Sequence, residues 1–463
     1  MSLTKKPTRK EINRALGFVV DEIVRYDRLS RDHESIVKAI KDDGWLYQMP
    51  FPDGRRPTIG KAAHEALTDI SRAIVASDER LKGKVKVSSY SEILSEKFGR
   101  ALFEKTEIDE PVFIEECTAE AASKLLEVRD IYIPCIAPDF LNMKKFRIGP
   151  VSFYEKESFL RDRAGDIQQY KHLNFEDFES YYKVQNWIAC VRVSDFQAEL
   201  GTERAYLMVR LALASIKCYM DTNQSKWIGT ERQSMPTLRR FSLASYPEMT
   251  TSNQIHVGWS VQYVNSGGGK DSQFLLSKNA RGWFNLLGAF LDANKDKGYW
   301  NFLDTKIITA MIWLDIGNSQ ISDAEKVVAF SNCLEALFVS SDQGIKRQIV
   351  DRSAGFLEHS GWFPELNDRV GDFYLSRCKL VHGEASPISA DIREAAHIGK
   401  YLTDVCMEGF LHFAHWMLLK HQAEGTREHE LPYTGKGSFE KAMLVELPLF
   451  LKVIGRGVRR ETG

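Results

Sequence analysis

The chain of 463 residues is long enough for two or three domains, and its 43% hydrophobic and 27% charged residues are typical of a globular protein, not a disordered one. Its formal net charge of −1 gives no overall positive field, so binding of nucleic acid would need a local basic patch. The seven cysteines include no C-x-x-C pair, which favours a reducing cytoplasm and argues against a zinc ribbon or a disulfide framework. The basic start lacks an apolar segment with a cleavage site, and no apolar run reaches about 18 residues, so we expect neither a signal peptide nor a membrane span.

The first two regions of the chain differ in their apolar pattern. Residues 1–128 are predicted to be helical, because apolar residues recur at three- and four-residue steps. Residues 129–318 instead carry short β-rich segments separated by proline and glycine, such as 131–138 and 186–196, with a long helix predicted at 197–220. This pattern indicates a mixed α/β region.

A helical bundle is predicted for residues 319–425. Four amphipathic segments with short links favour an antiparallel arrangement, and Ser322 is a suitable N-cap for the first. The residues after 425 are polar and then apolar, so the tail 426–463 is expected to pack back as a strand or helix. The predicted fold class is therefore α+β, mainly α. The four segments are 322–341, 344–360, 369–383 and 390–422.

The third of these segments ends in an unusual way. Its apolar residues form one stripe, but Arg377 falls inside that stripe, where packing would favour leucine. His382 closes the predicted helix, and Gly383 can adopt the left-handed cap conformation without a Cβ clash. Arg377 and His382 lie about 140° apart on a regular helix, so they could converge only if the helix ends at the histidine. The stripe consists of Val370, Phe373, Tyr374, Leu380 and Val381.

Three consecutive helices each place one charge on their apolar side: Glu335, Arg352 and Arg377. A lone buried charge costs several kcal/mol, so these groups must pair or face a wet cleft. One interpretation is a structural ion pair of Glu335 with either arginine. The other is a site in which the arginines bind phosphate and His382 acts as a general acid or base near neutral pH. With one carboxylate for two arginines, positive charge is left over for a ligand.

The spacing R-x4-6-H occurs three times, so the spacing alone is weak evidence. Only the third occurrence has the flanks Tyr-x-x-Arg-x-Lys-Leu-Val-His-Gly, and two further motifs, LEAL and DRSA, precede it. This ordered set resembles the Apea-like branch of the HEPN superfamily over about 100 residues, from Ser322 to His421. The three occurrences are Arg28–His33, Arg352–His359 and Arg377–His382, and the motifs span Leu334–Leu337, Asp351–Ala354 and Tyr374–Gly383.

The resemblance implies a helical bundle that forms a homodimer, and a metal-independent endoribonuclease without a cofactor. Arg377 and His382 would be the catalytic pair that drives attack of the ribose 2′-OH on the adjacent phosphate, leaving a 2′,3′-cyclic phosphate. The substrate would be RNA, such as tRNA or mRNA, and the role that of a toxin or an anti-phage defence effector. Residues 1–318 would then sense a phage-derived trigger or a regulatory protein, or select the substrate. The supporting residues would be Glu335, Arg352, Tyr374, Cys378 and Lys379.

The sequence departs from the family pattern at one position. Active members frequently carry Asn, Asp or His directly after the arginine, where this chain has Cys378. Two alternatives therefore stay open: a catalytically inactive HEPN module that binds a nucleotide or a partner protein, and an antitoxin-like structural partner.

Other motifs are weaker. The segment Ser266–Ser272 lacks the first glycine and the Ser or Thr of a phosphate loop, so we interpret it as a flexible connection. Three histidines near the end of the last bundle helix could bind a metal but more often pack or face solvent, and Cys378 could be a reactive thiolate. Aromatic residues interleaved with arginines could stack single-stranded RNA, although core packing is the commoner role, and GRGVRR with Lys452 could contact a phosphate backbone. The histidines are His412, His415 and His421, and the interleaved residues are Trp259, Tyr263, Trp283, Phe284, Trp300, Arg239, Arg240 and Arg281.

Overall fold

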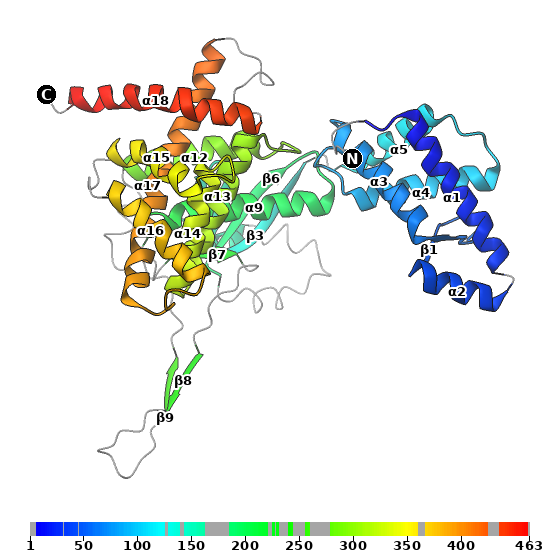
Figure 1. Cartoon of the computed structure of the whole chain (residues 1–463), viewed down its shortest axis with the longest axis horizontal. Coiled ribbons are helices and arrows are strands. Elements are labelled where there is room, and N and C mark those ends of the chain that lie inside the picture. Colours follow the sequence, from blue (N-terminus) through cyan, green and yellow to red (C-terminus); the bar gives the residue numbers. More distant parts are fainter. Residues whose placement is uncertain are drawn as a thin grey trace. The chain divides into compact units, whose positions relative to one another are not determined.

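The chain folds mainly into helices with a smaller share of strand, as the sequence predicts (Figure 1). The computed structural model describes residues 6–30, 32–44, 46–125, 128–138, 143–162, 185–220, 225–226, 228–230, 239–243, 255–259, 278–359, 366–424 and 435–461. Only the backbone is described at 33, 43, 239–243, 255–259, 278–280, 359, 366–368 and 454–461. The chain divides into two compact units, the first made of residues 1–129, 193–204 and 296–299 and the second of the remainder.

The first unit is largely helical. Thr8 and Glu11 form a capping box at the start of its first helix, because the hydroxyl of Thr8 accepts the Glu11 N–H and the Glu11 carboxylate accepts the Thr8 N–H. The apolar faces of the helices share one core, which includes Leu16, Leu67 and Phe98. The elements are α1 (Arg9–Leu29), α2 (His33–Asp43), β1 (Leu46–Gln48), β2 (Thr58–Gly60), α3 (Lys61–Ser77), α4 (Val87–Glu104) and α5 (Glu110–Ser123).

The second unit contains a sheet with the strand order β4-β5-β6-β3-β7. Strand β5 pairs antiparallel with both β4 and β6, and most of β6 is buried, as expected for a strand covered on both faces. Strands β8 and β9 form a separate antiparallel hairpin. The elements are β3 (Arg129–Ile136), β4 (Lys145–Ile148), β5 (Val151–Glu155), α6 (Lys156–Asp162), β6 (Trp187–Val193), α9 (Ala198–Lys217, with residues 205–217 in this unit), β7 (Gly229–Thr230), β8 (Arg239–Leu243) and β9 (Ile255–Trp259).

The bundle follows the sheet in the same unit, and the four segments expected there are helices. Helix α14 is central, because α13, α15, α16 and α17 all contact it. Helix α16 approaches α17 closely at Gly399, where the ring of Phe373 occupies the space that a Cβ atom would need. The elements are α12 (Lys278–Asn294), α13 (Phe302–Ser319), α14 (Asp323–Phe338), α15 (Ile345–His359), α16 (Leu366–Val381), α17 (Ala390–Ala423) and α18 (Lys436–Glu461).

Beyond the first predicted boundary, at residue 128, the compact units differ from the predicted domains. The mixed region, the bundle and the tail belong to one compact unit instead of three, because α13 packs along α14 and the tail helix α18 contacts α13, α15 and α17. Helices also begin earlier than the pattern indicates, since α12 and α13 precede residue 319. Helix α13 is buried over so much of its circumference that no broad polar face marks it as amphipathic.

Candidate functional site

The C-terminal end of α16 is closed by a glycine, as the sequence predicts. Gly383 has a φ of 73°, and its N–H donates to the Leu380 carbonyl at 3.1 Å. The N–H of Glu384 donates to the Lys379 carbonyl at 2.7 Å, which completes a Schellman motif. The backbone N–H of His382 keeps its helical bond to the carbonyl of Cys378 at 3.0 Å, so the histidine is the cap residue directly after the helix.

Glu335 of α14 and two residues of α16 form a polar cluster in the seam between these helices. The Tyr374 hydroxyl donates to Oε1 of Glu335 at 3.0 Å, and Nη2 of Arg377 lies 3.6 Å from the same oxygen. The Arg377 guanidinium also lies 5.7 Å from the centre of the Tyr374 ring. Burial, and then the neighbouring Glu335 carboxylate, raise the pKa of Tyr374 to about 12, so this tyrosine stays a hydrogen-bond donor. Of the ion pairs that the sequence left open, the structure forms the one between Glu335 and Arg377.

Arg377 keeps unused hydrogen-bonding capacity. Its contact with Glu335 is an ion pair that exceeds hydrogen-bonding distance, and both side chains are about three-quarters buried, with 25% of each exposed. Its Nε atom is buried and donates to no group in the described part of the chain. A guanidinium has five N–H donors, and a buried donor without a partner costs about 1–3 kcal/mol. The exposed quarter of the Arg377 side chain is the part that an anion such as phosphate could reach.

The other motif residues of α16 and its cap are more open to solvent than the stripe residue Tyr374. His382 and Lys379 are exposed, while Cys378 is a half-buried free thiol. Within the described residues, no hydrogen bond or ion pair joins the side chains of His382 and Arg377. Because the helical bonding continues to His382, the two side chains keep roughly the 140° separation of a regular helix. A single chain therefore presents Arg377 in the seam and His382 at the surface.

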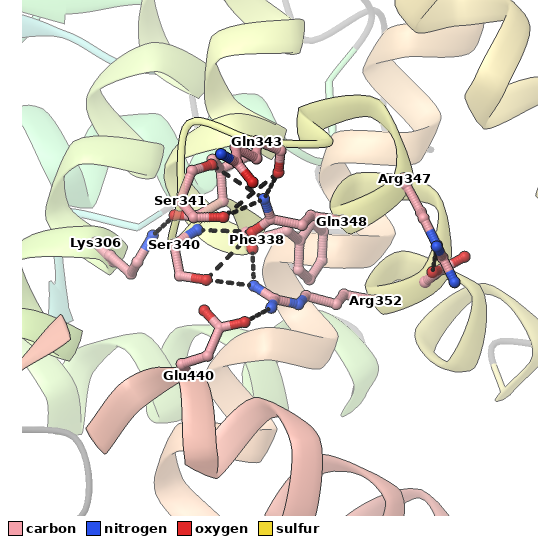
Figure 2. A network of polar contacts seen from close by, with 11 residues as sticks. Lys306, Phe338, Ser340, Ser341, Gln343, Arg347, Gln348, Arg352 and Glu440 are labelled. Carbon is pink, nitrogen blue, oxygen red and sulfur yellow. Dashed lines mark hydrogen bonds and ion pairs between the residues drawn. The ribbon is translucent and has the colours of Figure 1, made fainter. Parts of the chain in front are cut away.

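Arg352 belongs to a different network, so its expected role beside Glu335 and Arg377 is corrected. Its guanidinium donates to the Phe338 carbonyl, to the Ser340 hydroxyl at 3.0 Å and to Glu440 of α18 at 2.6 Å (Figure 2). The cause is the tail helix, which supplies a carboxylate that the bundle pattern could not reveal. Only 10% of the Arg352 side chain is exposed.

A groove of about 770 Å³ continues the α14–α16 seam beyond the Glu335–Arg377 pair. The groove is mostly apolar. Its lining includes Val381, which is 54% exposed. Two further exposed residues lie close to lining residues in the sequence: Ile321 is 50% exposed and Ile388 is 87% exposed. The sequence placed Val381 in the apolar stripe of α16, but as the last residue of the helix it lines the groove and is exposed. The lining residues are Trp313, Ile316, Gln320, Ala324, Glu325, Val328, Ala329, Leu380, Val381, Gly383, Glu384, Ala385, Ser386 and Pro387.

Among the weaker candidates, some side chains are packed in the core, some are exposed, and some belong to residues that the structure does not describe. Trp283 is a core residue whose indole N–H donates to the Ser215 carbonyl at 3.2 Å, and Phe284 packs edge-on against Tyr219. His421 is buried and its Nδ1 lies 3.3 Å from a Glu424 oxygen. The remaining side chains are exposed, partly buried or not described. Trp300 is partly buried, and four candidates are exposed: Arg281, His412, His415 and Lys452. The structure does not describe Tyr263 or Ser266–Ser272. It also does not describe the side chains of Arg239, Arg240, Trp259, His33, His359 and residues 455–460.

The sequence analysis missed Lys306 of α13 and a buried charge cluster around Asp315 of the same helix. Lys217 and Asp315 are almost fully buried, with Nζ and Oδ1 2.5 Å apart, and Arg210 contacts the same carboxylate at 2.6 Å. For this cluster the signal was present, because Lys217 and Asp315 each interrupt a run of apolar residues. A charge at such a place needs a partner from another element.

No family model, no curated protein and no solved structure matches this chain. Among the described residues, no three His, Cys, Asp or Glu side chains are grouped so that they could hold a metal ion. No helix in the described ranges has both the length and the apolar character needed to cross a bilayer.

Proposed function

We propose that this protein is a cytoplasmic, metal-independent endoribonuclease and that α14–α17 form a HEPN bundle with Arg377 and His382 as its catalytic pair. The observation that carries the proposal is the Arg377 guanidinium, which is oriented by Glu335 while its Nε has no partner among the described residues. Such a group suits a phosphate that gains negative charge during reaction. The exposed His382 adds an imidazole that can accept or donate a proton.

The proposed reaction uses the substrate's own nucleophile. A histidine removes the proton of a ribose 2′-OH, whose oxygen attacks the adjacent phosphorus while the bond to the 5′-oxygen of the next nucleotide breaks. The products are a 2′,3′-cyclic phosphate and a 5′-hydroxyl, the latter protonated by a general acid. Arg377 stabilises the charge on the non-bridging oxygens. DNA lacks the nucleophile and is not cleaved.

This chemistry favours two copies of the chain. The attacking and leaving oxygens are in line on opposite sides of phosphorus, so base and acid must approach from opposite sides. One chain brings one His382 to the motif and points it away from Arg377. A second copy across a twofold axis supplies the second histidine. The apolar groove and the exposed Val381 and Ile388 beside the motif are suited to seat that copy.

Substitution of Arg377 and of His382 by alanine tests the reaction. Purified wild type and both variants are incubated with total RNA, and the new ends are mapped for cyclic phosphates. We expect both variants to lose cleavage by at least about a hundredfold. Arg369→Ala is the matched control, because this arginine of the same helix is half exposed and pairs with Glu394 at 3.6 Å, away from the motif. Equal cleavage by all four proteins would overturn the proposal.

The role of the second copy has a separate test. Ile388→Glu places a charge on the rim of the groove, where the side chain is 87% exposed and folding should not suffer. We expect a monomer in sedimentation and loss of cleavage. Leu419→Glu, at a 52% exposed position of α17 outside the groove lining, is the control that should stay dimeric and active. A wild-type protein that is monomeric while cutting RNA would refute the composite site.

The biological role follows the resemblance, and we propose a toxin or anti-phage effector whose first unit and sheet region respond to a trigger. RNA is therefore also examined in cells during phage challenge, with the same variants. If wild type and variants behave alike there too, the nuclease proposal fails.

A second function is favoured by Cys378, which stands where active family members frequently carry Asn, Asp or His. In that case the bundle binds a nucleotide or a partner protein through Arg377 without cleaving RNA. Calorimetric titration of the purified chain with nucleoside phosphates distinguishes the two. Binding that is lost in Arg377→Ala, without RNA cleavage by wild type, would favour this alternative.

A further inference from the structure

The last turn of α14 is held by two cations that reach it from neighbouring helices. The Lys306 ammonium group of α13 donates to the carbonyls of Ala336 and Val339, at 2.8 and 2.7 Å. From α15, the Arg352 guanidinium donates to the carbonyl of Phe338. Carbonyls at a helix C-terminus lack partners within the helix and carry partial negative charge, so cations stabilise this end.

The loop that follows α14 is fixed as well. The backbone N–H and the hydroxyl of Ser340 donate to Oε1 of Gln348, at 3.0 and 3.2 Å. The Gln348 side-chain amide donates in return to the carbonyls of Ser341 and Gln343, at 3.0 and 2.7 Å. Helix α14 therefore cannot unwind at this end without breaking contacts to both α13 and α15.

The same turn carries the carboxylate that orients the proposed catalytic arginine. Glu335 begins the turn, and its carbonyl accepts the N–H of Val339 at 2.9 Å. Its carboxylate contacts Tyr374 and Arg377 in the seam with α16. A small rotation of the turn would move this carboxylate and leave Arg377 without its anchor.

We propose that Lys306 is a positioning residue of the ribonuclease: by holding the last turn of α14 it fixes Glu335, and through Glu335 it fixes Arg377. The proposal rests on the function proposed above. Lys306 touches neither Arg377 nor the seam, so its effect on RNA cleavage is transmitted by one helical turn. Arg352 holds the same turn from α15 and is the second member of this support.

The surroundings of Lys306 make its effect measurable by pH. Only 8% of the residue is exposed, and burial, followed by repulsion from Arg352, lowers its pKa to about 8. Of the charged groups of α18, Glu440 raises this pKa and Lys436 lowers it. Charged donors form stronger hydrogen bonds than neutral ones, so the hold on the α14 carbonyls weakens when Lys306 loses its proton.

Activity and stability should therefore respond to pH in opposite directions. Cleavage should fall severalfold as the pH rises through about 8, because Arg377 is less well positioned. Over the range from about 8 to the ordinary value of 10.5, the unfolded chain binds a proton at Lys306 that the folded chain has lost. The contribution of Lys306 to the free energy of unfolding thus rises over this range. A residue that only stabilised the fold would move both quantities together.

Two substitutions on α18 test this without removing Lys306. Glu440→Gln removes the group that raises its pKa, so the alkaline loss of cleavage should move to lower pH. Lys436→Gln removes a group that lowers it, at an exposed position, so the loss should move to higher pH. We expect shifts of a few tenths of a pH unit, with opposite signs. Identical profiles in wild type and both variants would overturn the proposal while leaving the nuclease intact.

Hydrogen exchange of a peptide covering residues 331–343 separates this outcome from failure of the nuclease. Wild type, Glu440→Gln and Lys436→Gln are compared at one pH near 8, where the fraction of charged Lys306 should differ. We expect the amide of Val339 to exchange up to about twofold faster in Glu440→Gln than in Lys436→Gln, in line with the expected difference in the neutral fraction of Lys306. This difference without RNA cleavage would support the hold on α14 and refute the nuclease. Equal exchange would refute the hold itself.

Discussion

Arg352 and Arg377 lie on consecutive helices, both within apolar stripes, yet the structure uses them in opposite ways. Arg352 donates three hydrogen bonds, to a backbone carbonyl, a hydroxyl and a carboxylate. Arg377 has one ion pair at 3.6 Å and a buried Nε without a partner among the described residues. The difference teaches that an arginine within the apolar stripe of a helix can be expected only to face the bundle interior. The number of its satisfied donors separates a structural arginine from one available to a ligand.

The largest expected effect is on cleavage by Arg377→Lys. Lysine keeps the charge but lacks the planar fork that matches phosphate oxygens, so we expect a loss of about a hundredfold. The free energy of unfolding should change by less than about 1 kcal/mol, because the lost contact is a single ion pair of a partly exposed side chain. Cleavage rates and urea unfolding measure the two effects. A large loss of stability with normal cleavage would show that Arg377 is the structural arginine and does not act in cleavage.

Arg352→Met should show the reverse balance. Removing a nearly buried guanidinium leaves the Phe338 carbonyl and Glu440 without a donor, which we expect to cost about 2–4 kcal/mol in urea unfolding. Arg347→Met is the matched control on α15, since that side chain is 87% exposed and its pair with Asp351 is a surface contact worth less than about 1 kcal/mol. Cleavage by Arg352→Met, measured well below its melting temperature, should fall by a smaller factor than in Arg377→Lys. Similar unfolding of the two methionine variants would show that Arg352 is not structural.

The smallest expected effect concerns Tyr374→Phe, which removes one donor from Glu335. We expect a loss of about 1–2 kcal/mol at neutral pH, because the acceptor is charged. In wild type, the folded chain keeps the phenol proton between pH 10.0 and about 12 while the unfolded chain loses it, so stability falls as the pH rises through this range. In Tyr374→Phe, the part of the decrease in the free energy of unfolding that comes from the Tyr374 phenol is absent. Unfolding at pH 9 and pH 11 measures it, and equal slopes in both proteins would contradict the bond to Glu335.

Local chemistry made the ends of the bundle helices predictable. A glycine after His382 and a serine at residue 322 each supply what a helix end requires, and the structure uses both. Helix α13 was not predictable in the same way, because a helix buried over most of its surface has no polar face to reveal its period.

The site was predictable in its members but not in its partners. Apolar periodicity placed Glu335, Arg352 and Arg377 on inward faces, and the Glu335–Arg377 pair formed. The partner of Arg352 depends on Glu440, which is 88 residues further along the chain and on a helix whose packing no local pattern fixes. The separation of His382 from Arg377 follows from the helical bond to Cys378, which the sequence could not decide.

The contribution of α18 has a consequence for the order of events during synthesis. Glu440 completes the surroundings of Arg352, and Phe439 places its ring 4.8 Å from the Lys306 ammonium group. A ribosome makes the chain from the N-terminus, so α13–α17 emerge before α18. The support beneath Glu335 therefore lacks its α18 contacts while the chain is still short of residue 440. A nascent chain that already contains Arg377 and His382 would still lack the contacts of α18 with Arg352 and Lys306. These contacts would form only after α18 has been synthesised.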